Sequence, residues 1–228
     1  MSDKTLPIEH PDRIQLYSLT TPNGPKASIA LEAVELSYEA HKVKILENEQ
    51  FSEQFIAVCP NSKIPAIVDS DGPHGEPLAI FESGAILLHP TEKTGKLLPS
   101  DPRKRSECLQ WPFFQMAGVG PMFGQFGHFY KFAKEIIPYP TERYTNEARR
   151  LLGVLEKRLE GRDYLMDDEY TIADICTFPW VGGLDWGYGA REDLKLDADF
   201  PNVVAWYTRC TEKPASVRGA KVCGFSDD

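Results

Sequence analysis

Three short motifs in the first ninety residues combine polar side chains with the local signals of a helix or strand boundary. They are Thr21-Pro22-Asn23-Gly24, Lys63-Ile64-Pro65-Ala66 and Glu82-Ser83-Gly84-Ala85. The first motif predicts a helix start, with Thr21 as the N-cap and Pro22 at the first helical position. A helix start carries unpaired N–H groups and partial positive charge, so it would stabilise a thiolate placed beside it. The alternative is that Thr21 and Asn23 only cap the helix.

The proline of the second motif stands directly before a predicted strand. X-Pro bonds are cis in only about 5–6% of cases in folded proteins, so Pro65 by itself indicates little more than a strand boundary. If the bond between Ile64 and Pro65 is cis, the backbone N–H and C=O of Ile64 can turn outward. They would then pair with a bound peptide as an added strand would.

The third motif joins the end of a predicted strand to a second helix start. Ser83 can cap the helix that follows Phe81, and its hydroxyl and the helix N–H groups would hold a carboxylate. Glu82 could pair with an ammonium group next to that carboxylate. An α-amino acid head carries both groups side by side, so the motif is suited to binding one. The alternative is a helix cap followed by nothing more than an exposed acid.

None of the cysteines lies in these motifs. The chain has five, at Cys59, Cys108, Cys176, Cys210 and Cys223. Their scattered spacing contains no Cys-x-x-Cys and no Cys/His cluster with zinc-ligand spacing, so we expect no metal site. Free thiols favour a reducing compartment, and we expect the cytoplasm. A reactive sulfur at the first motif would therefore have to belong to a ligand.

The composition is that of a globular protein large enough for one or two cores. The chain has 228 residues, of which 42% are hydrophobic and 26% are charged. A net charge of −9 argues against nucleic acid or an anionic membrane as a partner. We expect no signal peptide, because no basic region followed by an apolar run opens the sequence, and no apolar stretch is long enough to span a bilayer.

The hydrophobic periodicity predicts two unlike halves. The first has the order βαβαββα, which indicates a mixed sheet with helices on its faces. Its predicted strands are residues 13–17, 39–45, 66–69 and 78–81, and its predicted helices begin near residues 21, 51 and 83. Residues 97–102 read as a linker, with two prolines. Beyond the linker only helical spacing occurs, so the second half is predicted to be all-helical.

The three motifs, in this order across this pattern, resemble the glutathione transferase superfamily. The details are most similar to the Nu-class enzymes and to the related branch of prion-forming nitrogen regulators. The matching segments of the first half are residues 21–24, 61–69 and 81–87, and those of the second half are residues 109–111, 120–122, 137–139, 142–144 and 171–175. The resemblance implies a thioredoxin-like glutathione-binding domain at residues 12–96, an all-α domain at residues 103–228, and a homodimer.

The resemblance also implies a role for individual residues. The glutathione sulfur would lie beside Thr21 and Asn23, which are the implied catalytic residues. The backbone of Ile64 would pair with the cysteinyl unit, and Glu82 and Ser83 would hold the γ-glutamyl end. The full set of implied glutathione-binding residues is Gln50, Lys63, Ile64, Pro65, Glu82, Ser83 and Arg143.

Members of this branch tend to reduce disulfides with glutathione and to conjugate electrophiles poorly. The resemblance therefore implies a glutathione-dependent disulfide oxidoreductase with glutathione as co-substrate and a small disulfide or electrophile as its second substrate. Hydrogen bonds to the sulfur would favour the thiolate, which is the nucleophile in thiol–disulfide exchange. Tyr17, Ser18 and Thr20 remain possible substitutes as donors. The alternative function is a non-catalytic glutathione-binding regulatory or interaction module.

Three further features lie outside the glutathione motifs. The aromatic run that contains Phe123, Phe126 and Tyr130 could line a second-substrate pocket, but its helical spacing fits a core equally well. Thr171-x-x-Asp174 reads as a structural capping box. His89-Pro90 departs from the pattern of the superfamily and should shorten or kink the helix that begins near residue 83.

Overall fold

The computed structural model describes residues 8–225 and divides them into two compact units. The first unit comprises residues 8–96 together with residues 214–225, and the second comprises residues 97–213. The predicted second domain, residues 103–228, extends beyond the second unit. The difference arises because the C-terminal helix α10 (Pro214–Gly219) packs against α1 (Gly24–Val34) of the first unit.

A four-stranded mixed sheet forms the centre of the first unit. Strand β1 pairs with β2 in parallel and with β3 in antiparallel orientation, and β3 pairs with β4 in antiparallel orientation, which gives the order β2-β1-β3-β4. The strands are β1 (Ile14–Ser18), β2 (Tyr38–Lys42), β3 (Ala66–Asp69) and β4 (Leu78–Phe81). Strand β2 ends three residues earlier than predicted because a 3₁₀ turn begins at Ile45.

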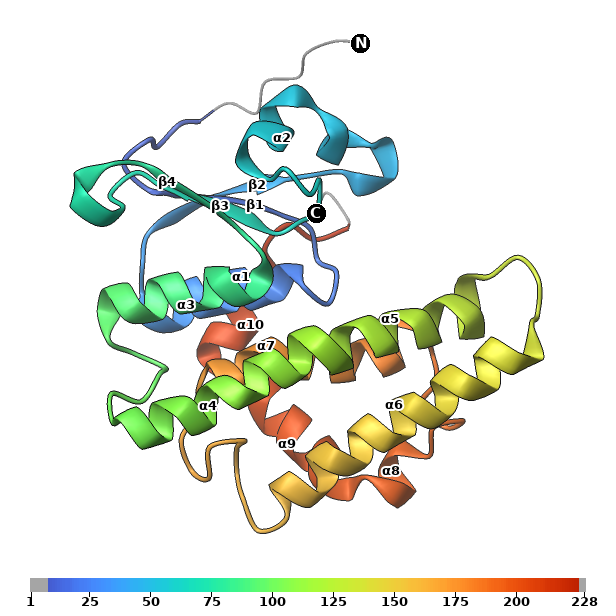
Figure 1. The fold of residues 1–228 in the computed structure, drawn as a ribbon. Helices are drawn as coiled ribbons and strands as arrows, with labels where there is room; N and C mark the ends of the chain where they lie inside the picture. Colours follow the sequence, from blue (N-terminus) through green and yellow to red (C-terminus); the bar gives the residue numbers. More distant parts are fainter. Residues whose placement is uncertain (1–7, 226–228) are drawn as a thin grey trace. The chain divides into compact units, whose positions relative to one another are not determined.

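Helices cover both faces of this sheet. Figure 1 shows α1 and α3 (Ser83–Thr94) on one face and α2 (Glu53–Val58) on the other. Alternation along β1 separates the two cores, because Leu16 packs toward α1 and α3 whereas Tyr17 packs toward α2. The 3₁₀ turns of the unit are Ile45–Glu47, Glu49–Phe51 and Pro73–Gly75. The predicted βαβαββα order of a thioredoxin-like domain is confirmed.

Helix α3 runs through Pro90 to Thr94, so the shortening that was one of the two expected effects of His89-Pro90 does not occur. The Thr94 hydroxyl donates to the Pro90 carbonyl at 2.7 Å, and Gly95 ends the helix in the left-handed conformation at φ 70°. His89 has a partner of its own, because its Nε2 lies 2.7 Å from the buried carboxylate of Asp69 at the end of β3. The last turns of α3 are therefore attached to the sheet.

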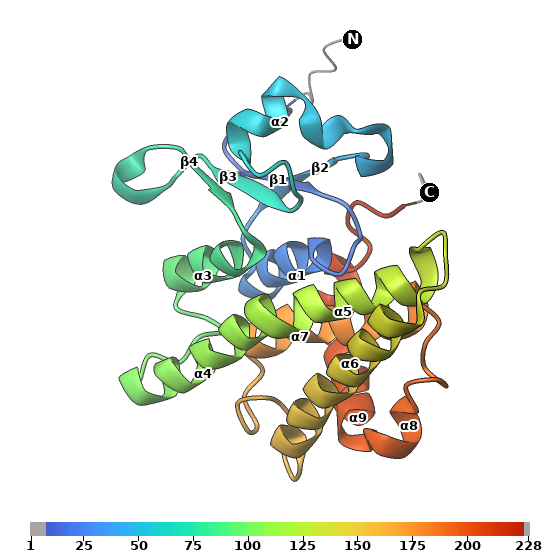
Figure 2. The same ribbon diagram turned by 45° about the vertical axis from the view of Figure 1, so that its right-hand side comes forward.

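The second unit is helical, as predicted. In Figure 2 the long helix α6 (Pro138–Leu159) packs beside α5 (Gly120–Gly127). Its other α-helices are α4 (Pro102–Phe114), α7 (Ile172–Gly182), α8 (Leu196–Asp199) and α9 (Pro201–Thr211), and its π-helical segments are Gln115–Val119, His128–Phe132 and Gly183–Gly187. Within residues 97–213 the only extended pairings are two isolated bridges, Tyr164 with Asp167 and Met166 with Glu169.

The start of α7 is fastened by Asp174, whose side chain is fully buried. One carboxylate oxygen accepts from the Thr171 N–H at 2.9 Å, while the Thr171 hydroxyl accepts from the Ala173 N–H at 3.2 Å. The other oxygen accepts from the Leu165 N–H at 2.9 Å and from the Trp206 indole at 2.8 Å. The predicted capping box is therefore present, and it also connects α7 to two other segments of the unit.

Candidate functional site

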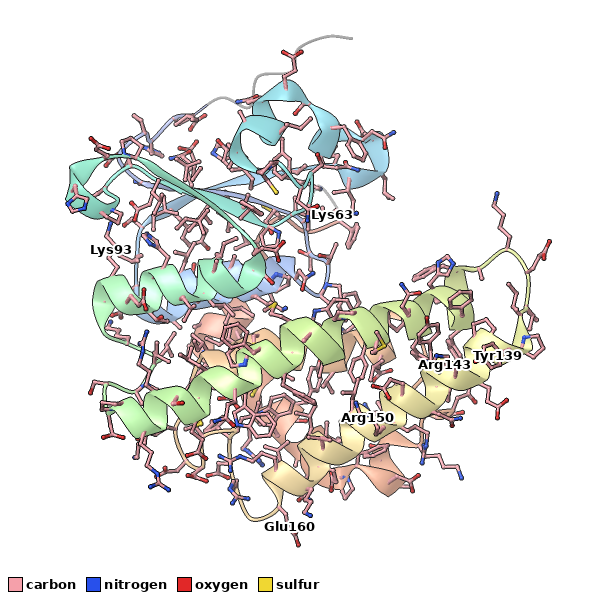
Figure 3. All side chains as sticks on the ribbon, in the orientation of Figure 1. Lys63, Lys93, Tyr139, Arg143, Arg150 and Glu160 are labelled. Atoms are coloured by element: carbon pink, nitrogen blue, oxygen red, sulfur yellow. The ribbon has the colours of Figure 1, made fainter. Side chains whose placement is uncertain are left out.

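A cavity of about 240 Å³ lies in the first unit, where α1 and α3 begin and the chain enters β3. Its lining residues are Asn23, Cys59, Asn61, Lys63, Ile64, Pro65, Glu82 and Ser83. Figure 3 labels Lys63 at this position, on the loop before β3. All three sequence motifs contribute to the lining, so the fold brings together segments that are up to sixty residues apart in the sequence.

The first motif places Asn23 directly before α1, which begins at Gly24. Asn23 is therefore the N-cap, and the prediction that Thr21 caps the helix was wrong. The reason is a tight turn, in which the Thr21 N–H donates to the Leu19 carbonyl at 2.7 Å. A Cβ atom on Gly24 would lie 1.9 Å from that same carbonyl, so the helix can begin there only with glycine. Thr21 is not among the residues that line the cavity.

The Asn23 side chain makes no capping hydrogen bond to the described helix. The N–H groups of the first turn of α1 are the usual donors at a helix start, and they carry the positive end of the helix dipole. An anion held at this position would be stabilised by the positive end of α1. The side-chain amide of Asn23, the residue directly before the helix, could also donate a hydrogen bond to it.

The second motif contains a cis peptide bond between Ile64 and Pro65. Ile64 precedes the first residue of β3, and both Ile64 and Pro65 line the cavity. Within the described part of the chain, neither the N–H nor the C=O of Ile64 makes a backbone hydrogen bond. These groups are the ones that an extended peptide would need for pairing.

At the third motif the N-cap of α3 is Glu82 rather than Ser83, which is the first residue of the helix. Glu82 has φ 71°, in the left-handed region that residues other than glycine seldom adopt. Strained backbone conformations cluster at functional sites, and Glu82 is the one positive-φ residue other than glycine that lines the cavity in the described part of the chain. Its carboxylate is exposed and forms no ion pair with another described residue. Ser83 is only 7% exposed, and its hydroxyl oxygen accepts from the Lys26 ammonium at 3.4 Å.

Two residues had no role assigned to them from the sequence: Asn61, which lines the cavity, and Lys26, which contacts Ser83. Lys26 is the more unusual of the two. It lies in the first turn of α1 and is fully buried, although lysine is among the residues least often buried completely. Its position contains a signal, because a cation near the positive end of a helix is unfavourable and therefore requires a specific environment. Here the Lys26 Nζ atom lies against the hydroxyl of Ser83, which is one of the residues that line the cavity.

The other predicted glutathione contacts do not line this cavity. Gln50 lies in a 3₁₀ turn, and its Oε1 atom is buried without a hydrogen-bond partner among the described residues. Arg143 belongs to α6 of the second unit, where Figure 3 labels it, and its side chain is exposed. The pKa of Glu147 is lowered mainly by the hydrogen bond from Arg150, and the charge of Arg143 lowers it further.

The aromatic run of the second unit is placed mainly in the core. Phe123 and Phe126 are at most 1% exposed. Tyr130 is half-buried and stacks on Phe126, with ring centres 4.9 Å apart. Its hydroxyl donates to the carboxylate of Asp193, which raises the pKa of Tyr130 to about 12. The two phenylalanines are therefore buried, and neither lines the cavity of the first unit.

All five cysteines are free thiols. Burial raises the pKa of Cys108 and Cys210, and it raises the pKa of Cys223 to about 11, so these sulfurs stay protonated near neutral pH. Cys59 lines the cavity, yet it is only 1% exposed and its Sγ donates to the Lys63 carbonyl at 3.2 Å. The one cysteine sulfur among the residues that line the cavity is thus engaged with the backbone.

Residues 8–225 contain no group of three or more side chains arranged to hold a metal ion. Across the same residues, no helix combines the length and the apolar character required to cross a bilayer.

Comparison with known proteins gives consistent results over both units. Residues 13–89 match the glutathione S-transferase N-terminal domain, and residues 141–214 match the glutathione S-transferase C-terminal domain. The disulfide-bond oxidoreductase YfcG of Escherichia coli (strain K12) is 47% identical over 204 residues, which cover 89% of this chain and 92% of that protein.

Two solved structures are similar at 50% sequence identity. A glutathione transferase family member from Pseudomonas fluorescens, solved with two glutathione bound, has a TM-score of 0.92 and covers 95% of this chain and 96% of its own. A glutathione transferase from Pseudomonas putida, solved with one glutathione disulfide bound per protein subunit, has a TM-score of 0.91 and covers 94% of each chain. With both domains matched in order, this chain belongs to the glutathione S-transferase family.

Proposed function

We propose that this chain is a glutathione-dependent disulfide oxidoreductase of the Nu-class type, with glutathione as co-substrate and no metal. The observation that carries the proposal is the convergence of the three motifs around one cavity. The relatives support it, because YfcG is a disulfide-bond oxidoreductase and the Pseudomonas putida transferase binds glutathione disulfide.

In the proposed complex the γ-glutamyl end of glutathione lies at the start of α3. Its carboxylate accepts from the Ser83 hydroxyl and from the N–H groups of the first helical turn. The Lys26 side chain, which contacts the Ser83 hydroxyl, adds electrostatic attraction when it is protonated. The ammonium of the γ-glutamyl end pairs with the exposed carboxylate of Glu82. The cysteinyl unit pairs with the backbone groups of Ile64, next to Pro65, which make no backbone hydrogen bond to residues 8–225. Gln50 and Lys63 contact the rest of the tripeptide.

The glutathione sulfur would then lie at the start of α1, with the Thr21 hydroxyl and the Asn23 amide as donors. Hydrogen bonds to the charged form lower the pKa of a thiol, so the reactive thiolate is favoured. The structure disfavours the substitutes, because Tyr17 and Ser18 are at most 4% exposed. The third substitute, Thr20, uses its hydroxyl on the carbonyls of Val222 and Cys223.

The proposed reaction is one thiol–disulfide exchange. The thiolate of bound glutathione attacks the glutathione sulfur of a small mixed disulfide, a new S–S bond forms and the old one breaks. The leaving thiolate takes up a proton, and the products are glutathione disulfide and a free thiol. Arg143 is a proposed partner for the carboxylate of the second glutathione moiety, since arginine pairs well with carboxylates.

Steady-state rates test this proposal directly. We expect efficient glutathione-dependent reduction of a small mixed disulfide and weak conjugation of aromatic halides. Strong conjugation with negligible reduction would instead indicate a transferase with an apolar electrophile pocket. Binding of glutathione without turnover of either substrate would indicate the non-catalytic module.

The assembly and the compartment are also proposals. The family suggests a homodimer, and the free cysteines suggest the cytoplasm. Analytical ultracentrifugation at several concentrations measures the first, since a monomer gives half the expected mass. Fractionation of the source cells measures the second.

Ser83→Ala is expected to weaken glutathione binding by about 1–3 kcal/mol, because the ligand carboxylate loses a hydrogen bond in a buried setting. Calorimetry on the folded variant measures this affinity. The matched control is Ser52→Ala, since Ser52 caps α2 of the same unit and does not line the cavity. Equal affinities for the wild type and Ser83→Ala would contradict the placement of the γ-glutamyl end.

Cys59→Ser is expected to keep most of the reductase activity, because the proposed nucleophile belongs to glutathione. Serine can still donate to the Lys63 carbonyl that Cys59 contacts now. Turnover, together with mass spectrometry for a mixed disulfide on the protein, measures the outcome. A folded but inactive Cys59→Ser protein would point to a glutaredoxin-like mechanism through Cys59.

A further inference from the structure

The C-terminal segment, residues 214–225, packs closely along α1. Among the described helices, α10 and α1 form the most extensive pairwise contact, and Figure 1 shows the two side by side. A Cβ atom on Gly219 would lie 2.7 Å from the Ile29 backbone, so this approach requires glycine. Ser28 of α1 is only 1% exposed, and its hydroxyl donates to the Gly219 carbonyl at 2.7 Å. Arg218 of α10 forms an ion pair with Glu32 of α1.

Beyond α10 the segment reaches the loop between β1 and α1. The Thr20 N–H donates to the Cys223 carbonyl at 3.0 Å. The Thr20 hydroxyl lies 3.1 Å from the Val222 carbonyl and 3.0 Å from the Cys223 carbonyl. Val222 packs against the core cluster that includes Leu16, and Cys223 has φ 54°. The packing of Val222 therefore restricts the position of the two carbonyls that contact Thr20.

This loop is short and leads directly to the proposed thiolate donors. It leaves β1 after Ser18 and enters α1 at Gly24, so Thr20 is adjacent to Thr21 and three residues before Asn23. At its helix end the loop is confined by the close approach of Gly24 to the Leu19 carbonyl. At its strand end the contacts of Thr20 with residues 222 and 223 confine it. Asn23 lies between these two confined points of the chain.

We propose that residues 222 and 223 act through Thr20 as a positioning clamp, which holds the β1–α1 loop so that its donors meet the glutathione sulfur. The inference rests on the proposed function, because it needs a thiolate at Asn23. Thr20 is a positioning residue, since its hydroxyl is committed to the C-terminal segment. The clamp adds a part of the chain far from the three motifs to the machinery of the reaction.

The alternative is that the C-terminal segment only stabilises the first unit. The chain offers a control, because Ser28→Ala also removes a buried hydrogen bond between α1 and this segment. It removes in addition a contact within α1, to the Pro25 carbonyl at 3.3 Å, but leaves the contacts of Thr20 with residues 222 and 223 in place. Both Thr20→Val and Ser28→Ala should lower the melting temperature. Only Thr20→Val should change the chemistry at the sulfur.

The experiment compares the wild type, Thr20→Val, Thr20→Ser and Ser28→Ala as full-length proteins with glutathione and a mixed disulfide. Turnover is measured together with an ultraviolet titration of the bound glutathione thiolate. We expect Thr20→Val to reduce kcat by at least about tenfold, since small misplacements of a reacting group are costly. The same variant should raise the pKa of the bound thiol, Thr20→Ser should restore both, and Ser28→Ala should change neither.

Two outcomes overturn the inference. One is a folded Thr20→Val protein with the kcat and thiol pKa of the wild type, and the other is a Ser28→Ala protein with the same losses as Thr20→Val. If Thr20→Val does not fold, Thr20→Ala in the full-length protein replaces it, and a kcat and thiol pKa equal to those of the wild type would overturn the inference. A wild type that binds no glutathione would overturn the proposed function itself, and the clamp with it.

Discussion

Asn23→Ala is expected to slow glutathione-dependent disulfide reduction about 100-fold, which is the usual effect of losing one donor to a developing or bound anion. Asn23 lines the cavity at the start of α1, and its side chain makes no capping hydrogen bond to the described helix. Urea unfolding of the variant separates an effect on the thiolate from an effect on the fold. Thr21→Ala, which removes the second proposed donor, is expected to have an effect of similar size.

An isosteric variant makes this test sharper. Asn23→Asp keeps the shape of the side chain but replaces a donor with a negative charge, which disfavours a thiolate nearby. Its bound glutathione thiol should titrate at higher pH than that of the wild type. In Asn61→Ala, which alters another amide that lines the cavity, the thiol should titrate as in the wild type. Unchanged turnover in folded Asn23→Ala and Asn23→Asp would exclude Asn23 from the sulfur site.

Asp174→Ala is expected to destabilise the protein by about 3–5 kcal/mol, because it leaves several buried donors without an acceptor. The carboxylate accepts from the Thr171 and Leu165 N–H groups and from the Trp206 indole, in a side chain with no exposed surface. Urea unfolding measures the loss. The control is Asp168→Ala, an exposed neighbour, which should stay within about 0.5 kcal/mol of the wild type.

The same residue gives stability a specific dependence on pH. Burial raises the pKa of Asp174 from 3.8 to about 6, although the hydrogen bonds it accepts act in the opposite direction. A raised pKa means that the folded state binds the proton more tightly than the unfolded state. The contribution of this group to stability is therefore complete below pH 3.8 and is lost as the pH rises through about 6. The free energy of unfolding of Asp174→Asn should lack this component, and parallel pH profiles for the two proteins would contradict it.

Local sequence signals were enough to predict the order of the elements and the three motifs. Period-two and helical patterns, prolines and cap residues act over a few residues, so they can be read without knowing the fold. The same holds for the capping box of Thr171 and Asp174, whose two partners stand three residues apart. Family resemblance added the expectation of glutathione, which no local pattern contains.

The tertiary structure decided what depends on contacts between distant segments. The approach of Gly24 to the Leu19 carbonyl sets the start of α1 and makes Asn23 its cap. The hydrogen bond from the buried Lys26 to Ser83 connects the starts of α1 and α3, through two residues that are fifty-seven positions apart in the sequence. The close contact between Gly219 and Ile29 draws the C-terminal segment into the first unit, where the sequence predicted a continuous second domain. Each of these features follows from packing between surfaces that meet only in the folded chain, and no pattern along a single segment encodes such a meeting.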